Sequence, residues 1–189
     1  MKIIFIRHSK SLVNPEIPIA TWALSVEGVE LAKRLNNLEV IRSIEVIYSS
    51  LQPKALETAI LATKDLGIPI RINDDLTESS SFTNKFVGIS ELEENTKMYH
   101  ENANLSINNG ETSSQALKRF NSAVEKIVEA ESNRSVIGIV SHGGILADFA
   151  AQYARKSSFE LVKAMRQPDI AEFDYGKKEF LTSFGDTTI

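Results

Sequence analysis

Residues 3–11 of the chain read IIFIRHSKS, a short apolar run that stops at an arginine and a histidine. A continuous apolar run bounded by charged residues is typical of a strand that is buried on both faces of a parallel sheet. We therefore predict a strand over residues 2–6, which places Arg7 and His8 directly after its carboxyl end.

The rest of the chain alternates predicted strands with predicted helices. Several helix starts are marked by an N-cap serine, a first-turn proline or a capping box. Because such alternation puts helices on both faces of one sheet, we predict an α/β fold with three α/β/α layers. The predicted strands cover 44–50, 68–72 and 135–141. One predicted helix follows Ser25, a second begins at Pro53, a third covers 111–130 and a fourth covers 143–154. The third has Thr112 and Gln115 as its capping box.

Residues 170–184 are predicted to form a hairpin that turns near Gly176. Because the strands of a hairpin are antiparallel, we expect a mixed sheet in which most strands are parallel. With 189 residues, 42% of them hydrophobic, we predict a single domain over residues 1–189. The polar stretch 73–109 is only weakly periodic, and we expect an excursion over the surface at about 79–109. Its aromatic side chains either form a lid or pack against the sheet, and His100 is expected on the surface.

The composition limits the possible partners. The formal net charge is −4 and there is no dense cluster of Lys or Arg, so we expect no nucleic-acid partner. No apolar segment approaches the length of a membrane span, and we expect a soluble, cytoplasmic protein with no membrane partner. The absence of cysteine excludes disulfides, thiol catalysis and thiolate metal sites. We predict no cofactor, and the sequence gives no indication of the oligomeric state.

Two of the three histidines follow predicted strands: His8 after 2–6 and His142 after 135–141. The carboxyl ends of parallel strands share one edge of an α/β sheet, where ligands bind. Gly143 opens a helix at the same edge, where unpaired backbone N–H groups favour an anion. Arg7 and Lys54 add positive charge, so the sequence predicts an anion pocket.

These residues resemble the histidine phosphatase superfamily, also called phosphoglycerate mutase-like, over residues 2 to about 150. The signature at the start of that family is a strand, Arg-His-Gly and a later Asn, and RHSKSLVN supplies Arg7, His8 and Asn14 at that spacing. The other similar segments follow in the family's order: LSVEGVELAKRL (24–35), YSSLQPKALETA (48–59), LTE (76–78), GET (110–112) and SHGG (141–144).

The resemblance implies a phosphoryl-transfer site that needs no metal. His8 would attack phosphorus and carry a phosphohistidine intermediate. Arg7, Lys54 and His142 would donate hydrogen bonds to the phosphoryl oxygens and stabilise their charge in the transition state. Glu78 would protonate the leaving oxygen and then activate water.

Two further residues have less specific expected roles. Asn14 either binds a phosphoryl oxygen or forms an ordinary Asx turn. Gly143 is expected to contribute backbone contacts to the substrate.

The sequence departs from the family at two places. Ser9 and Lys10 follow the first histidine, where the family has Gly and then Glu or Gln, and Lys10 is expected to make the pocket mouth more positive and to favour a substrate with several negative groups. Lys54 stands where the family has its second arginine, and lysine lacks the planar fork that grips two oxygens. Loss of one charge-assisted hydrogen bond costs on the order of 1.5–3 kcal/mol, or roughly 10- to 100-fold in rate.

Three functions follow from this pattern. The first is a metal-independent phosphatase that acts on a small phosphomonoester, its expected partner. The second is a phosphoglycerate mutase-type phosphotransferase. Mutases of this family generally need a longer insert that closes over the substrate and excludes water, and the excursion at about 79–109 is short for that purpose. The third is a catalytically weak module that binds a phosphorylated ligand. Since a pure binder needs neither His8 nor Glu78, their presence together favours catalysis.

Overall fold

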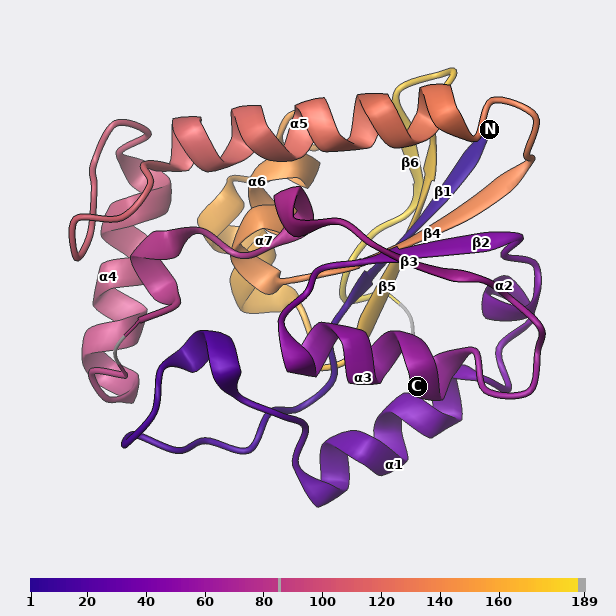
Figure 1. The fold of residues 1–189 in the computed structure, drawn as a ribbon. Helices are drawn as coiled ribbons and strands as arrows, with labels where there is room; N and C mark the ends of the chain where they lie inside the picture. The colour runs from indigo at the N-terminus through magenta and orange to yellow at the C-terminus, as the bar shows by residue number, and fades with distance from the viewer. Residues whose placement is uncertain (85, 187–189) are drawn as a thin grey trace.

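A single six-stranded sheet forms the centre of the computed structural model, which describes residues 1–84 and 86–186. Its strand order is β3-β2-β4-β1-β5-β6 (Figure 1). The pairs β1–β4, β2–β4 and β2–β3 are parallel, whereas β5 is antiparallel to both β1 and β6. The prediction of a mixed, mostly parallel sheet is therefore confirmed. The strands are β1 (Lys2–Arg7), β2 (Val46–Ser49), β3 (Ile70–Ile72), β4 (Val136–Ser141), β5 (Asp169–Asp174) and β6 (Glu179–Thr182).

Helices cover both faces of this sheet, which confirms the three predicted layers. In Figure 1, α1 and α3 lie against one face, and α5 runs along the other face with α6. The helices are α1 (Val26–Leu35), α2 (Glu39–Arg42), α3 (Pro53–Ala62), α4 (Ile89–Glu101), α5 (Ser113–Ala130), α6 (Gly143–Ala151) and α7 (Ser158–Ala164), with the 3-10 turns η1 (Ile19–Thr21), η2 (Asp74–Leu76) and η3 (Ser80–Phe82).

Strand β1 supplies both hydrophobic cores, because successive side chains of a strand point to opposite faces. Ile3 and Phe5 belong to the core under α5 and α6, whereas Ile4 and Ile6 belong to the core under α1, α2 and α3. All four side chains are fully buried. The continuous apolar run in the sequence is thus explained by a strand that has no solvent-facing side.

The predicted helix starts and the terminal hairpin agree with the structure. The Ser25 side chain accepts a hydrogen bond from the Gly28 backbone, Pro53 is the first residue of α3, and Thr112 forms a capping box with Gln115. Residues 170–184 form the hairpin of β5 and β6. The single-domain division stays a prediction, and residues 187–189 lie outside the described range. Among the described residues, no helix has the length and apolar character needed to cross a bilayer.

The sequence does not predict three of the helices: the single turn α2, and the longer α4 and α7. α4 lies inside the predicted surface excursion, and although most of it is exposed, Tyr99 is 1% exposed. α7 begins with a capping box of Ser157 and Glu160. α4 and α7 pack against each other. Their stability therefore depends on tertiary contact, which periodicity within one segment does not show.

Candidate active site

The β1–β4 register brings the two predicted histidines together. Arg7 pairs with Ser141 across the two strands, and the His8 backbone N–H donates to the Ser141 carbonyl at 2.9 Å. The next residue of each strand therefore leaves the sheet at the same edge. The rings of His8 and His142 lie 5.1 Å apart between centroids.

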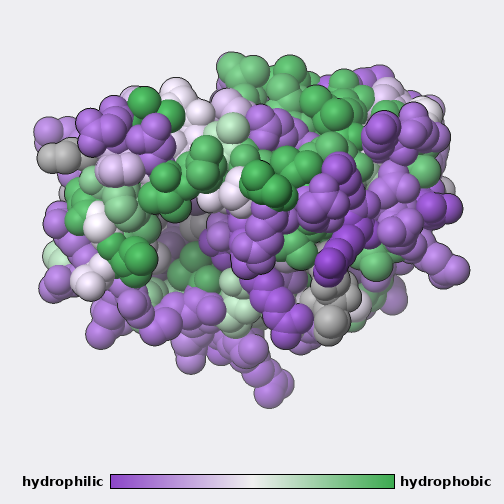
Figure 2. Space-filling model, turned by 90° about the horizontal axis from the view of Figure 1, so that it is seen from below, coloured by the Kyte–Doolittle hydropathy of each residue, from purple (hydrophilic) through white to green (hydrophobic). Residues whose placement is uncertain are grey.

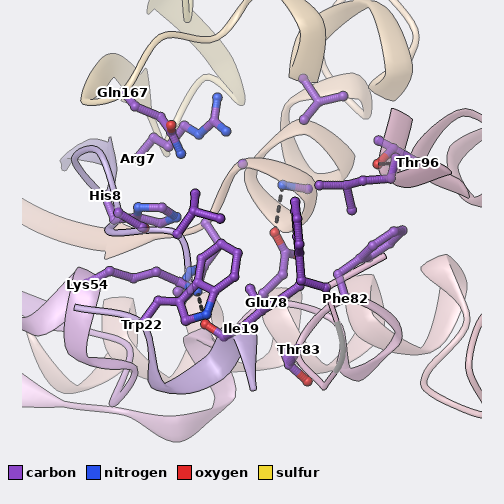
Figure 3. Close-up of a pocket in the computed structure, with 18 of the residues that line it drawn as sticks. Arg7, His8, Ile19, Trp22, Lys54, Glu78, Phe82, Thr83, Thr96 and Gln167 are labelled. Carbon is purple, nitrogen blue, oxygen red and sulfur yellow. Dashed lines mark hydrogen bonds between the residues drawn. The ribbon is translucent and has the colours of Figure 1, made fainter. Parts of the chain in front are cut away.

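A cavity of about 390 Å³ opens at this edge (Figure 3). Asn14 is not among the described residues that line it: the Asn14 Oδ1 accepts from the Glu16 backbone N–H at 3.0 Å, as in an Asx turn. The structure thus gathers all but one of the predicted site residues. Those in the cavity wall are Arg7, His8, Lys54, Glu78, His142 and Gly143.

His8 is held as a neutral imidazole with one nitrogen available. It is 6% exposed, and burial, followed by the positive charges of Lys54 and Arg7, lowers the pKa of His8 from 6.5 to about 3. The His8 Nδ1 lies 2.7 Å from the Ser9 carbonyl oxygen, which only accepts, so Nδ1 carries the hydrogen. The lone pair is then on Nε2, which is the state required of a nucleophile.

Lys54 and Arg7 are buried cations beside this ring. The Lys54 Nζ donates to the Ile19 carbonyl at 2.7 Å, and burial lowers the pKa of Lys54 from 10.5 to about 8. The Arg7 Nη1 donates to the Met165 carbonyl at 3.0 Å, and its buried Nε has no hydrogen-bond partner among the described residues. Burial also lowers the pKa of Arg7, although the Glu78 carboxylate opposes this shift. Both side chains keep donors free for an anion.

His142 presents a third donor to the cavity. Its Nε2 lies 2.9 Å from the Ser50 Oγ, which already accepts from the Gln52 backbone N–H. The Ser50 hydroxyl still has its own hydrogen to donate to Nε2, and that arrangement leaves the ring hydrogen on Nδ1. That Nδ1 is buried without a partner among the described residues. Burial, and after it the positive charges of Lys54 and Arg7, lower the pKa of His142 well below 6.5, so this ring too is neutral.

Glu78 faces the same cavity and caps α6. Its carboxylate accepts from the backbone N–H groups of Gly144 at 2.8 Å and Ile145 at 3.0 Å (Figure 3). The two glycines at the start of α6 make room for the charged groups. A Cβ at Gly143 would lie 2.8 Å from the Arg7 guanidinium carbon, and one at Gly144 would lie 2.9 Å from both Glu78 carboxylate oxygens. The sequence HGG is thus explained by close packing as well as by backbone donors.

The departures after His8 have separate structural outcomes. The Ser9 hydroxyl donates to the Gly28 carbonyl at 2.8 Å, and its backbone N–H donates to the Thr58 Oγ1 at 3.0 Å, so Ser9 ties the loop to α1 and α3. The expectation for Lys10 was wrong. Its Nζ forms an ion pair with Glu27, and Lys10 is not among the described residues that line the cavity.

Sequence reasoning missed the residues that hold the catalytic segments in place. Arg119 donates to the carbonyls of Asp75 and Thr77, just before Glu78, and forms a two-point ion pair with Glu111. Arg119 is more than 40 residues from the carbonyls that it binds, so no local pattern in the sequence indicates this contact. Glu111, in contrast, lies in the GET segment that resembles the family. His100, expected on the surface, lines the cavity instead, with its side chain 1% exposed. No group of three or more His, Asp or Glu suited to a metal ion occurs among the described residues.

Comparison with known proteins gives one family. The sequence profile described as "Histidine phosphatase superfamily (branch 1)" matches residues 3–171 of this chain. No sequence in a set of curated proteins matches it.

Solved structures share the fold at low sequence identity. A mycobacterial glucosyl-3-phosphoglycerate phosphatase is 17% identical, with a TM-score of 0.75 and 99% of each chain covered. A variant of phosphoserine phosphatase from Entamoeba histolytica is 18% identical, with a TM-score of 0.77 over 98% of this chain and 96% of that one. The α-ribazole phosphatase from Shigella flexneri is 22% identical, with a TM-score of 0.71 over 99% and 96% of the two chains.

The close approach at Gly144 predicts that Gly144→Ala destabilises the protein. The added methyl group would displace the Glu78 carboxylate from the start of α6, and overpacking of this kind costs about 1–3 kcal/mol. Urea denaturation measures the free energy of unfolding. Gly176→Ala is the matched control, because its nearest contact would be an ordinary 3.5 Å to Asp174. Equal free energies for Gly144→Ala and the wild type would contradict the described packing of Glu78.

The buried, cation-flanked position of His8 predicts that its ring stays neutral in acid. As the pH falls from 8 to 4, the nitrogen signals of His8 in NMR should keep the pattern of a neutral ring with its hydrogen on Nδ1, because its pKa is lowered to about 3. Lys54→Met removes one of the cations that disfavour protonation, so the pKa of His8 should rise in that variant. Titration of His8 near 6.5 in the wild type would show that the ring is not held as described.

Proposed function

Because the chain belongs to the histidine phosphatase superfamily, we propose that it hydrolyses a small phosphomonoester through a phosphohistidine on His8, without a metal ion. One observation carries this proposal. The neutral His8 shares a buried cavity with Arg7, Lys54 and His142, whose free donors suit a phosphoryl group, and with the Glu78 carboxyl group. A nucleophile, a set of charge-stabilising donors and an acid are the parts that phosphoryl transfer needs.

The first half of the reaction transfers the phosphoryl group to the enzyme. The His8 Nε2 attacks phosphorus, a P–N bond forms, and the P–O bond to the leaving group breaks. Protonated Glu78 gives its proton to the leaving oxygen, so an alcohol departs. The Arg7 Nε, Lys54 Nζ and His142 Nδ1 hydrogen-bond the three equatorial oxygens, where the charge of the transition state is spread.

The second half returns the enzyme to its starting state. The Glu78 carboxylate takes a proton from water, and the water oxygen attacks phosphorus. The P–N bond breaks, which releases inorganic phosphate and restores the lone pair of His8. Glu78 then holds the proton that it gave up in the first half, and the cycle is balanced.

The similar structures support a phosphatase without selecting its substrate. They are glucosyl-3-phosphoglycerate, α-ribazole and phosphoserine phosphatases, which differ widely in leaving group. For this chain we propose a small phosphorylated molecule as the partner and the cytoplasm as the compartment.

The two other functions are less well supported. A mutase acting on phosphoglycerate needs cations for the carboxylate of its substrate as well as for the phosphate. Among the described residues that line the cavity, Arg7 and Lys54 are the only lysine or arginine, and both lie beside His8. A module that only binds phosphorylated ligands would not need Glu78 opposite the nucleophile.

The proposed role of His8 predicts that p-nitrophenyl phosphate is hydrolysed in excess EDTA and that His8→Ala lowers kcat by at least about 1000-fold, as loss of a nucleophile does in other enzymes. Rapid quenching with a ³²P-labelled substrate should trap a label on the wild type that is labile in acid and stable in alkali. Met98→Ala, on the exposed side of α4, is the control and should be fully active. Activity that disappears with EDTA, or persists in His8→Ala, would refute the proposal.

The position of Lys54 predicts an alkaline limit to activity. Its pKa is lowered to about 8, so Lys54 is charged below that pH and loses its charge as the pH rises above it. The kcat/KM for p-nitrophenyl phosphate, which reports groups of the free enzyme, should fall above about pH 8. Lys54→Arg keeps its charge and should shift this fall to higher pH, whereas Lys54→Met should be roughly 10- to 100-fold less active at pH 7. The same alkaline limb in wild type and Lys54→Arg would exclude Lys54 as its cause.

A further inference from the structure

The cavity has two chemically different ends. The cations and the two neutral histidines lie at the base, where the strands end. Its outer wall is largely apolar and comes from the segment before α1, from η3 and from α4. Figure 2 shows hydrophobic side chains gathered around a hollow on the face seen from below. The apolar residues of the wall include Val13, Ile19, Trp22, Phe82, Phe86, Ile89 and Leu92, and α7 adds Val162.

One buried polar group interrupts this apolar wall. His100, on α4, lines the cavity with a side chain that is 1% exposed. Its Nδ1 lies 2.7 Å from the Asp148 Oδ1, and the other Asp148 oxygen accepts from the Ser113 hydroxyl at 2.9 Å. The Tyr99 ring packs edge-on against the imidazole, at 5.3 Å between centroids. The ring is therefore fixed in orientation by its hydrogen bond to Asp148 and by packing.

The remaining nitrogen of His100 has no partner within the described part of the chain. Its Nε2 is buried and makes no hydrogen bond there. Since a carboxylate accepts from Nδ1, that nitrogen carries the hydrogen, and in a neutral imidazole Nε2 is then an acceptor. A buried acceptor left unpaired is costly, and a donor on a bound ligand would remove that cost.

His100 lies away from the phosphate end of the cavity. Thr96 precedes it by one helical turn on α4, so the two share a face of that helix. Figure 3 shows Thr96 across the cavity from His8 and Lys54. A molecule with its phosphate at His8 would therefore direct its leaving group past the apolar wall toward His100.

We propose that His100, oriented by Asp148, is a specificity-determining residue that accepts a hydrogen bond from a hydroxyl group on the leaving group. The substrate class is then a phosphomonoester of an apolar alcohol that carries a second hydroxyl at its far end. This inference rests on the proposed phosphatase function, because it places the phosphate at His8.

The experiment compares substrates that differ only at the far end. 2-Phenylethyl phosphate is the parent compound, and its 2-, 3- and 4-hydroxyphenyl derivatives add a hydroxyl donor to a ring that two carbons separate from the leaving oxygen. The matching methoxy compounds offer an acceptor without a donor, and a 4-carboxyphenyl compound offers an anion. For at least one hydroxyl isomer, wild-type kcat/KM should exceed that of the parent and of its methoxy analogue by about 10-fold.

The variant His100→Phe keeps a ring in place and removes the acceptor. It should abolish the preference for the hydroxyl compound over the parent and the methoxy analogue, whereas Met98→Ala, on the exposed side of α4, should keep both the preference and the wild-type rates. If His100→Phe does not fold, the wild-type substrate series alone decides. Equal rates for the parent and every hydroxyl isomer would overturn the inference. So would a preference for the methoxy or carboxylate compound, or a hydroxyl preference that persists in His100→Phe.

Failure of the phosphatase proposal would be seen separately, as absence of turnover of all these compounds and of p-nitrophenyl phosphate by the wild type. In that case, calorimetric binding of the same phosphates to the wild type tests the contact with His100. A roughly 10-fold tighter binding of one hydroxyl isomer, lost in His100→Phe, would support it, and equal affinities would overturn it.

Discussion

The parallel register between β1 and β4 is the constraint on which the rest of the site depends. It sets Arg7 opposite Ser141, so His8 and His142 leave the sheet side by side. The register is itself fixed by the alternation that sends Phe5 into one core and Ile6 into the other, because a slip of one residue would exchange the two faces. The packing of the two cores therefore also sets the relative positions of Arg7, His8 and His142.

Burial at this edge makes the charges both costly and useful. Arg7 and Lys54 sit in a poorly solvated position that lowers the pKa of each. Burial first, and then these two positive charges, keep the nearby His8 neutral. A buried charge without a full set of partners is unfavourable. A phosphate dianion would supply the missing partners, so the arrangement that keeps the proposed nucleophile neutral would also attract the group that it is proposed to attack. The Glu78 carboxylate is held nearby by the first backbone N–H groups of α6. Its negative charge raises the pKa of Arg7 and of Lys54, against the effect of burial.

The parts of the structure that could be predicted from the sequence are those with local causes. The apolar run of β1, the cap at Ser25 and the box at Thr112 each act within a few residues, and each is where the sequence placed it. α4 was not predicted, because it is mostly exposed and is stabilised by packing against α7. The sequence likewise predicts His100 on the surface. Its partner Asp148 is 48 residues away, and no pattern near either residue indicates that they meet.

The two departures from the family also show which properties of a residue its local sequence does not indicate. Ser9 was noted only as a replacement for glycine, yet its hydroxyl binds the Gly28 carbonyl and fixes the loop that holds His8. From the sequence, Lys54 is expected to bind phosphate less well than arginine, because it lacks the planar guanidinium group. In the structure one of its three donor hydrogens is used on the Ile19 carbonyl, in the η1 turn, which leaves two for an anion. This tether joins the cationic base of the cavity to the apolar wall that η1 helps to form. The chemistry at the base is indicated by short family motifs, each of which can be recognised within a few residues. The wall, in contrast, is assembled from segments whose own sequences do not indicate that they meet, so the surroundings of the proposed leaving group are a property that only the fold reveals.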